Sequence, residues 1–357
     1  MDDAHLSARV TIDLVALQAN WKTLAALAPQ AETGAAIKGE AYGLGAAACG
    51  KALWDAGCRS FFVARPKEGA ELRAVLPEAS IYVLDGLYTG EAAYYLKHRL
   101  VPALIAFDEA EEWARDGKGA PCAIHIDSGI NRVSFSMAEA DKLAKARLPL
   151  NITLVMSHLA SSEEFENPFN QTQRENFEQT RALFPGVRAS FANSSGIFHD
   201  ERFALDLTRP GIALYGGNPK PGQPNPMKLV ATLEARVLQV RDMPKGQAIG
   251  YNSTWRAQRD TRIAMIGAGY ADGIPRRMSS TFGTAHVFVG GRRCPIVGRV
   301  SMDMTAVDVT DADVKRGDYA EFFGPHISLD EAAASAGTIS WELLTHIGRR
   351  YARRYLT

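Results

Sequence analysis

The chain has 357 residues, of which 46% are hydrophobic and 22% charged, a composition typical of a folded protein of about two domains. Its 40 basic and 40 acidic side chains cancel at pH 7, which argues against binding to nucleic acid or to an anionic membrane. The four cysteines lie far apart and lack the spacing of a zinc site, so we expect reduced, buried thiols and no metal centre.

The N-terminal segment is acidic and lacks the basic start and apolar core of a secretory signal, so we expect a cytoplasmic protein. No stretch of the sequence is long and apolar enough to cross a bilayer. Residues 8–12 follow as a candidate strand, before a helix that Asp13 would cap. Since this strand has no evident partner in the N-terminal part, we expect it to join a sheet of the C-terminal part.

The first 216 residues alternate short β-branched or aromatic runs with longer helical patterns, a rhythm typical of βαβ units. Several runs are almost continuously apolar, as expected of parallel strands that are covered on both faces. Eight such strands favour an α/β fold with a closed (β/α)8 TIM-like barrel, and an open doubly wound sheet is the alternative. The predicted strands span residues 35–39, 61–65, 81–84, 101–106, 123–127, 152–157, 189–193 and 205–209.

Four prolines between residues 219 and 226 can continue neither a helix nor a central strand, so we place a domain boundary there. We expect an N-terminal strand at 1–12 that joins the C-terminal domain, a barrel at 13–217 and a mainly β domain at 227–357. In that last domain we predict strands at 229–240, 262–266, 286–289 and 319–323, and helices at 329–336 and 341–351.

Polar side chains end several of the predicted barrel strands, at the rim where the active sites of such barrels lie. Lys38 ends the first strand, where burial would favour the neutral amine that forms a Schiff base, although an ordinary surface lysine remains the alternative. Any one of the other polar residues could be structural, but their repetition at equivalent points favours a site. They are His125, Asp127, Arg132, His158, Asn193, Ser194 and Arg209.

The glycine that follows the last of these residues suits an anion site. In Arg209-Pro210-Gly211-Ile212, Gly211 lets backbone N–H groups approach a ligand closely, as a phosphate site late in such a barrel requires. The sequence contains no G-x-S-x-G elbow, H-E-x-x-H helix or P-loop lysine, so hydrolase, zinc-protease and NTPase functions lack support.

Residues 37–45, Ile-Lys-Gly-Glu-Ala-Tyr-Gly-Leu-Gly, resemble the pyridoxal-phosphate lysine motif of the alanine racemase family, a fold type III family. The resemblance implies a TIM-like barrel followed by a β domain, a head-to-tail homodimer with shared active sites, and pyridoxal 5′-phosphate as cofactor. It also implies an isomerase that interconverts L-alanine and D-alanine and supplies D-alanine for peptidoglycan. Similar motifs follow in order at residues 125–132, 157–160, 192–196, 209–216, 250–251, 269–273 and 301–303.

By this resemblance Lys38 holds the cofactor as an aldimine and is one of two catalytic bases, and Tyr251 of the partner subunit is the second. Two bases are needed because a proton leaves one face of Cα and another arrives on the opposite face. Arg209 would face the pyridine nitrogen, and His158 would link Arg209 to Tyr251 and help the phenol to ionise. Arg132 would contact the cofactor's phenolic oxygen and the substrate carboxylate.

The resemblance implies further contacts to the cofactor and to the substrate. The cofactor contacts would be Tyr42, His158, Asn193, Ser194, Gly211, Ile212 and Trp341. The substrate contacts besides Arg132 would come from the partner subunit, as Tyr270, Met302 and Asp303.

The chain departs from the usual family pattern at four positions. Glu40 and Leu44 stand where asparagine and histidine are usual, and Trp341 replaces a phosphate-binding tyrosine. His125 stands where many members have a carbamylated lysine that orients Arg132, so His125 itself, a bound anion or another group must take that role.

Three alternative functions stay open at this point. One is a racemase of serine or of broader specificity. Another is a pyridoxal-phosphate-dependent amino-acid decarboxylase, although Arg209 is unlike the carboxylate that such an enzyme places at the pyridine nitrogen. The third is a non-catalytic pyridoxal-phosphate-binding barrel, against which the residues after 217 argue because such a protein has no second domain.

Overall fold

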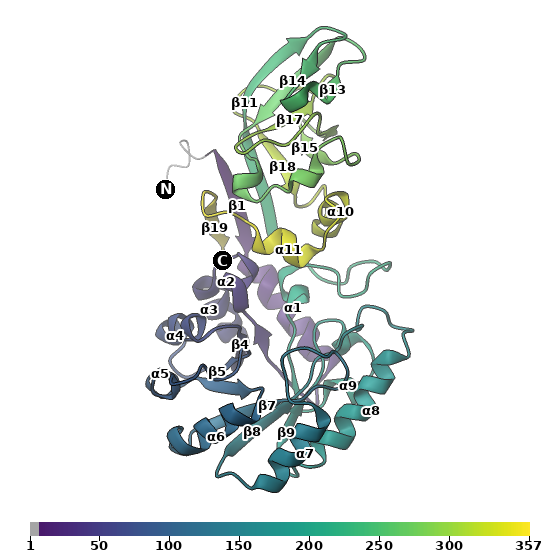
Figure 1. Cartoon of the computed structure of the whole chain (residues 1–357). Coiled ribbons are helices and arrows are strands. Elements are labelled where there is room, and N and C mark those ends of the chain that lie inside the picture. The colour runs from purple at the N-terminus through teal and green to yellow at the C-terminus, as the bar shows by residue number, and fades with distance from the viewer. Residues whose placement is uncertain (1–6) are drawn as a thin grey trace.

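The structure is a computed structural model that describes residues 7–357, and it has two lobes arranged end to end (Figure 1). The N-terminal lobe contains seven parallel strands in one sheet, in the order in which they follow along the chain. These strands are short and nearly fully buried, which is why the sequence shows them as apolar runs. They are β3 (Ala35–Ala36), β4 (Ser60–Val63), β5 (Ser80–Val83), β6 (Val101–Leu104), β7 (Pro121–His125), β8 (Asn151–Met156) and β9 (Arg188–Ser190).

A second, two-stranded parallel sheet completes the ring. β2 (Glu32–Thr33) precedes β3 with only Gly34 between them, and β10 (Leu207–Thr208) pairs with β2. On its other side, the segment around β10 donates a backbone hydrogen bond from Asp206 to the Ala189 carbonyl at 3.1 Å. The eight predicted strands and the barrel are therefore confirmed, although several strands end earlier than predicted.

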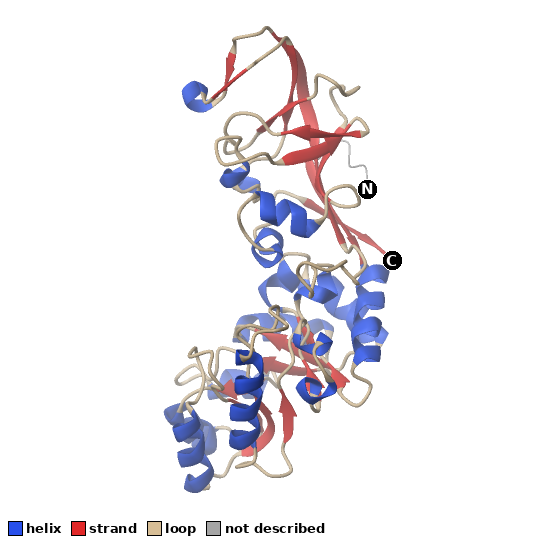
Figure 2. Ribbon diagram, turned by 90° about the vertical axis from the view of Figure 1, so that its right-hand side faces the viewer, coloured by secondary structure: helices blue, strands red, loops and turns tan. Residues whose placement is uncertain are grey.

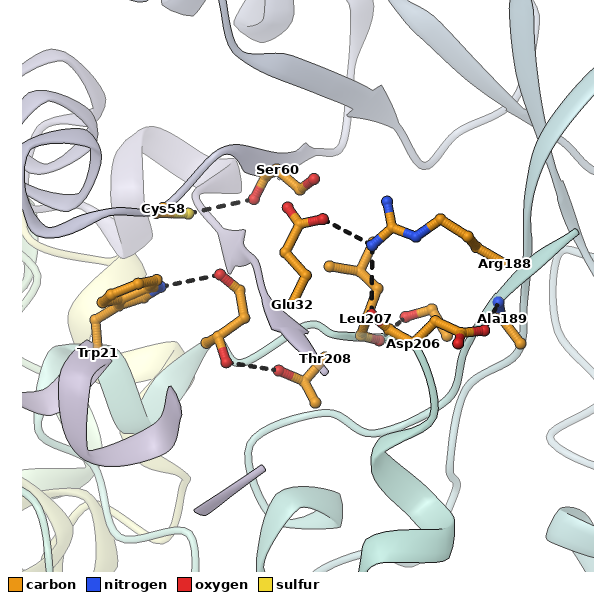
Figure 3. Close-up of polar contacts among 11 residues, drawn as sticks. Trp21, Glu32, Cys58, Ser60, Arg188, Ala189, Asp206, Leu207 and Thr208 are labelled. Carbon is orange, nitrogen blue, oxygen red and sulfur yellow. Dashed lines mark hydrogen bonds and ion pairs between the residues drawn. The ribbon is translucent and has the colours of Figure 1, made fainter. Parts of the chain in front are cut away.

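Side chains hold the seam between β9, β10 and β2 (Figure 3). Arg188 donates to the Glu32 carboxylate at 2.7 Å and to the Asp206 carbonyl at 3.3 Å, while the Asp206 carboxylate accepts from the Ala189 N–H at 2.7 Å. The Arg188–Glu32 pair is partly exposed, so it adds little free energy, but it fixes the relative position of the strands.

Helices surround the barrel on the outside (Figure 2). Asp13 caps the first of them by accepting from the Ala16 N–H at 2.8 Å, as the sequence predicts. The helices of this lobe are α1 (Leu14–Leu27), α2 (Lys38–Tyr42), α3 (Ala46–Ala56), α4 (Pro66–Val75), α5 (Ala92–Lys97), α6 (Phe107–Asp116), α7 (Met137–Ala146), α8 (Phe169–Arg181) and α9 (Glu201–Ala204), with 3-10 turns η1 (Gly196–Phe198) and η2 (Ile212–Tyr215).

The second lobe is mainly β, as predicted (Figure 2). Its main sheet has the order β16-β15-β18-β11-β1-β19, and β14 and β17 extend it from β11. The strands are β11 (Ala231–Met243), β12 (Ala248–Ile249), β13 (Trp255–Arg256), β14 (Thr261–Ile266), β15 (His286–Val289), β16 (Arg292–Pro295), β17 (Thr305–Asp308) and β18 (Tyr319–Phe323), with 3-10 turns η3 (Tyr251–Ser253), η4 (Tyr270–Asp272) and η5 (Arg276–Met278).

The first described strand lies in this second sheet. β1 (Ala8–Asp13), the strand expected at 8–12, pairs antiparallel with β11 and parallel with β19 (Ala352–Leu356). β1 thus joins an early segment to two segments that come more than 200 residues later. Figure 1 shows these three strands at the junction of the lobes.

One predicted helix is wrong at its C-terminal end. α10 (Leu329–Ser335) agrees with the prediction, but α11 (Ser340–Thr345) stops well before residue 351, and β19 follows soon after it. The backbone of β19 forms its hydrogen bonds with β1, a partner that periodicity along one segment cannot reveal. Of the helices in residues 7–357, none has the length and apolar character needed to span a bilayer. All four cysteines are free and buried, as expected.

Candidate active site

A cavity of about 1660 Å³ opens at the C-terminal ends of the barrel strands. α11 of the second lobe covers one side of it through Trp341 and its neighbours. The cavity brings together the predicted site residues of the barrel with Trp341. These residues are Lys38, Tyr42, His125, Arg132, His158, Asn193, Ser194, Arg209, Gly211, Ile212 and Trp341.

Lys38 begins an unusual turn. The strand before it ends at Ala36, so the predicted strand over 35–39 is too long. From Gly39 to Tyr42 every residue has a φ between 53° and 60°, which forms a single left-handed turn. For residues with a Cβ this conformation costs about 1–2 kcal/mol each. The turn therefore persists only because surrounding groups hold it.

Those groups lie on both sides of the turn. The Gly39 N–H donates to the Glu68 carboxylate at 2.8 Å. On the other side, Arg353 in β19 donates to the Gly43 carbonyl through Nε at 3.0 Å and Nη2 at 2.8 Å. The Tyr355 hydroxyl of the same strand donates to the Leu44 carbonyl at 3.0 Å. The second lobe thus fixes the backbone that presents Lys38 to the cavity.

The surroundings of Lys38 favour its neutral amine. Its side chain is open to the cavity, yet the surrounding protein removes much of its solvent, and this desolvation is the main cause that lowers its pKa. The positive charge of Arg132 lowers the pKa further, whereas the carboxylates of Asp85 and Glu68 raise it and Arg209 again lowers it. A lysine with a lowered pKa is a better nucleophile and base near neutral pH.

Arg209 is buried directly after β10. Its guanidinium donates to the Ser157 carbonyl and the Ser190 hydroxyl, and burial lowers its pKa to about 10, so it stays protonated at neutral pH. Burial, followed by the charges of Arg209 and Arg132, holds the pKa of His158 well below its usual value. His158 is therefore neutral at pH 7. The hydrogen bonds of the Arg209 guanidinium within residues 7–357 do not include His158, the partner that we expected.

Ser194 and Gly211 form a cradle for an anion. The Ser194 hydroxyl oxygen accepts from the Gly211 N–H at 2.9 Å and the Ala213 N–H at 3.2 Å, which uses both of its lone pairs and leaves its proton to donate. A Cβ on Gly211 would lie 2.2 Å from the Tyr42 hydroxyl, so only glycine admits this approach. Burial raises the pKa of Tyr42 to about 12, which keeps the phenol protonated as a donor.

His125 is a buried polar side chain that lacks a partner. Only 7% of it is exposed, and neither ring nitrogen forms a hydrogen bond with any residue in the described part of the chain. Burial, then the charges of Arg209 and Arg132, lower its pKa to about 3, so the ring is neutral. Because an unsatisfied buried polar group costs about 1–3 kcal/mol, this ring indicates a site made for a ligand.

The loops after the seventh and ninth strands are ordered by side-chain bonds to the backbone. Asp127 accepts from the Gly129 N–H at 2.7 Å and the Arg132 N–H at 3.1 Å, which sets the loop from which Arg132 reaches the cavity. Asn193 accepts from the Gly196 N–H at 2.9 Å and donates to the Ser162 hydroxyl at 2.9 Å. Asn193 therefore shapes the wall as well as lining it.

Two of the four unusual positions do not line the cavity. Glu40 accepts from the Ala46 N–H at 3.2 Å, which caps the start of α3, and Leu44 is fully buried. The other two, His125 and Trp341, line the cavity. Of the four departures from the family pattern, those at His125 and Trp341 can therefore contact a ligand in the cavity.

Apart from Trp341, the predicted site residues of the second lobe do not line this cavity. Tyr251, Tyr270 and Met302 are 68%, 45% and 53% exposed. Asp303 accepts from Arg350 at 2.8 Å, and Arg350 also pairs with the buried Asp272. These side chains lie on the surface, where a second chain can meet them.

Two cavity carboxylates that act on Lys38 were not predicted. Glu68 and Asp85 line the wall after β4 and β5, and both carboxylates act on the charge of Lys38. Pro66 at the start of α4, with Glu68 two residues later and Arg65 before it, is a helix-start pattern that could have drawn attention to Glu68. Nothing comparable in the sequence marks Asp85.

Comparisons with known proteins agree over nearly the whole chain. The family models described as "Alanine racemase, N-terminal domain" and "Alanine racemase, C-terminal domain" match residues 12–219 and 230–355. An alanine racemase of Methylobacterium sp. (strain 4-46) is 47% identical, with 98% of each chain covered. A biosynthetic alanine racemase of Agrobacterium fabrum is 41% identical, over 98% of this chain and 93% of that protein.

A solved structure gives the same result in three dimensions. The crystal structure of alanine racemase from Bartonella henselae with covalently bound pyridoxal phosphate superposes with a TM-score of 0.93 and 39% identity. The match covers 98% of this chain and 99% of that one. Together with the barrel, the β lobe and the lysine at the barrel rim, these matches show that the chain belongs to the alanine racemase family.

Proposed function

We propose that this protein is an alanine racemase that uses pyridoxal 5′-phosphate to interconvert L-alanine and D-alanine, and that it supplies D-alanine for peptidoglycan in the cytoplasm. The observation that carries this function is the position of Lys38. Its amine opens to the cavity beside Arg209 and the Ser194–Gly211 cradle. The family relationship supports the same reaction.

The residues of the cavity fit this cofactor. A phosphate needs several convergent donors, and the Ser194 hydroxyl proton and the Tyr42 phenol are both held as donors beside Gly211. Ile212 would add a backbone N–H and Trp341 its indole N–H. The unpartnered His125 ring and Asn193 would face the ring of the cofactor, and Lys38 would bind it covalently.

When bound, pyridoxal phosphate withdraws electrons from the amino acid that it carries and so makes the Cα proton acidic. Lys38 would take or return that proton at its Nζ, and its lowered pKa favours the neutral amine that this requires. Tyr251 of the partner subunit acts at its hydroxyl on the opposite face. Arg132 binds the substrate carboxylate.

Arg209 limits the chemistry to racemisation. Its guanidinium remains protonated at neutral pH and so would give no proton to the pyridine nitrogen of a bound cofactor, which it would face. A less electron-withdrawing ring stores less charge, which disfavours transamination. A decarboxylase would place a carboxylate at this position. His158 is kept neutral by burial and by the positive charge of Arg209. It would support Tyr251 by a hydrogen bond.

The proposed enzyme is a homodimer with two shared sites. Within one chain Tyr251, Tyr270, Met302 and Asp303 lie outside the cavity and are exposed, which supports a second copy as the source of these side chains at the site. Each chain would comprise a barrel at 13–217 and a second domain at 227–357, which the expected N-terminal segment at 1–12 joins through β1, while residues 1–6 of that segment lie outside the described residues. The two family models divide the chain at nearly the same place.

Three measurements test this function. Borohydride reduction and peptide mapping should place the cofactor on Lys38, and labelling of a different lysine would contradict the assignment. Tyr251→Phe should retain cofactor and lose racemisation of alanine, so wild-type turnover would exclude Tyr251 as a base. Mixed Lys38→Ala and Tyr251→Phe subunits should regain activity at one site of each heterodimer, whereas the absence of rescue would argue against shared sites.

A further inference from the structure

The Glu68 carboxylate joins two strand ends at the cavity rim. Its Oε1 accepts from the Gly39 N–H at 2.8 Å, in the left-handed turn that begins at Lys38. Its Oε2 accepts from the Ala64 N–H at 2.8 Å and the Arg65 N–H at 3.1 Å, just after β4. One side chain therefore satisfies three backbone donors from two neighbouring loops.

We propose that Glu68 is a positioning residue for Lys38, which holds the left-handed turn against the end of β4 and supplies a negative charge beside the amine. This inference rests on the function proposed above and assigns to Glu68 a role that acts through Lys38. It predicts that the geometry of the lysine depends on a carboxylate in the neighbouring loop.

The need for such a residue follows from the turn itself. A left-handed turn of L-residues is unfavourable, and the Gly39 N–H is its first donor, directly after Lys38. A hydrogen bond from an N–H to a carboxylate is about twice as strong as one between neutral groups. Glu68 is itself fixed because its other oxygen is bound to two N–H groups of the chain after β4.

The charge of Glu68 acts on Lys38 as well. The groups that act on the amine are Arg132 and Arg209, which lower its pKa together with burial, and Asp85 and Glu68, which raise it. The rings of His125 and His158 are neutral and contribute little. Loss of either carboxylate should therefore lower the pKa of Lys38 further. Of the two, only Glu68 is bonded to the turn, so only its loss should also release the turn.

The chain contains a matched control for the carboxylate bridge. Glu109 in α6 accepts from the Leu87 N–H and the Ile105 N–H, both at 3.1 Å, and so joins the loops after β5 and β6. It does not line the cavity and does not act on Lys38. Both bonds end on Oε2, so Glu109→Gln can keep them through its one amide oxygen, and this variant reports what loss of a bridging carboxylate's charge does at a place away from Lys38.

The experiment uses the full chain with three neutral variants, Glu68→Gln, Asp85→Asn and Glu109→Gln. In Glu68→Gln the amide has one acceptor oxygen, so its NH2 must face an N–H of one loop, and one bridge is lost. Steady-state kinetics on the cofactor-loaded enzyme give kcat and KM. On protein stripped of cofactor, trace acetylation with peptide mapping gives the pKa of Lys38 without any turnover.

We expect Glu68→Gln to lower the Lys38 pKa and to reduce kcat about tenfold with little change in KM, as loss of alignment would. Asp85→Asn should lower the Lys38 pKa with a smaller loss of kcat, and Glu109→Gln should leave both values unchanged. The proposal is overturned if Glu68→Gln matches Glu109→Gln in both measurements. A positioning role is also overturned if Asp85→Asn reduces kcat as much as Glu68→Gln, because charge alone would then explain the loss.

A second variant, Glu68→Asp, keeps the inference testable if Glu68→Gln does not fold. Glu68→Asp keeps the charge but cannot reach both loops, so kcat should fall while the Lys38 pKa stays near the wild-type value, and wild-type kcat would contradict the inference. The acetylation readout also separates this inference from the proposed function. If the wild-type protein did not racemise alanine, the function would fail, while a Lys38 pKa lowered in Glu68→Gln and not in Glu109→Gln would still support the role of Glu68.

Discussion

The contact between Gly211 and Tyr42 allows a stability prediction with a defined size. A Cβ at residue 211 would lie 2.2 Å from the Tyr42 hydroxyl oxygen and 3.1 Å from Cζ, well inside van der Waals contact. Tyr42 cannot swing away easily, because it is 6% exposed and its ring lies 4.7 Å from that of Tyr215. The φ of Gly211 is −122°, outside the left-handed region, so the close approach to Tyr42 and not a positive φ makes Gly211→Ala unfavourable.

Overpacking of this kind costs about 1–3 kcal/mol, so we expect Gly211→Ala to reduce the free energy of unfolding by that amount. Tyr42→Phe removes the hydroxyl but leaves Cζ at 3.1 Å, so the double variant should recover part of the loss and not all of it. Urea unfolding of the cofactor-free wild type, both single variants and the double variant forms a double-mutant cycle.

The cycle should give a coupling free energy of about 0.5–3 kcal/mol, in the direction of rescue. Additive single-variant effects would refute the steric reasoning, because they would show that the two groups do not interfere. Gly211→Ala should also weaken retention of pyridoxal phosphate, which fluorescence titration of the cofactor-free protein can measure. Unchanged retention would show that the cradle does not bind the phosphate.

Three further predictions concern the rest of the framework. Arg353→Met should lower the free energy of unfolding by about 1.5–3 kcal/mol in urea titrations, because the Gly43 carbonyl loses two bonds from a charged donor. Arg147→Gly should raise the melting temperature, since this exposed helix-end residue has a φ of 48° and glycine removes a left-handed penalty of about 1–2 kcal/mol. Burial raises the pKa of Glu109 to about 7, so the folded protein binds the proton more tightly than the unfolded chain. The stability of wild type relative to Glu109→Gln should therefore fall as the pH rises from about 4.5 to about 7.

Each of these predictions has its own contradicting result. Wild-type stability of Arg353→Met would show that β19 does not support the lysine turn. A lower melting temperature for Arg147→Gly would show that the arginine makes contacts that outweigh its backbone penalty. A stability difference between wild type and Glu109→Gln that is constant with pH, or that grows as the pH rises, would contradict the burial of the Glu109 carboxyl.

The strands of the barrel and the residues at its rim could be predicted because their causes are local. Parallel strands covered on both faces give apolar runs, and a polar residue directly after such a run lies at the rim. His125, His158 and Arg209 follow this rule and all line the cavity. Their chemical roles came from the family resemblance and stay predictions.

Other features could not be predicted, because distant segments cause them. Glu40, Ala41 and Tyr42 have no intrinsic preference for a left-handed turn, and the bonds that hold it come from Glu68 and from β19. The sequence of β19, Ala-Arg-Arg-Tyr-Leu, has no clear strand pattern, and its pairing with β1 decides its conformation. Glu68 itself was overlooked because it lies in a charged stretch rather than after an apolar run.

The pairing of β1 has a consequence for how the protein is made. Arg9 lies opposite Glu234 on one side and Ala352 on the other, so its neighbours leave the ribosome long after it does. All the barrel strands can emerge and pair before either neighbour of β1 exists. Until then β1 carries unsatisfied backbone edges, which expose a nascent chain to aggregation. Of the described segments, the one translated first is therefore among the last to reach its native place.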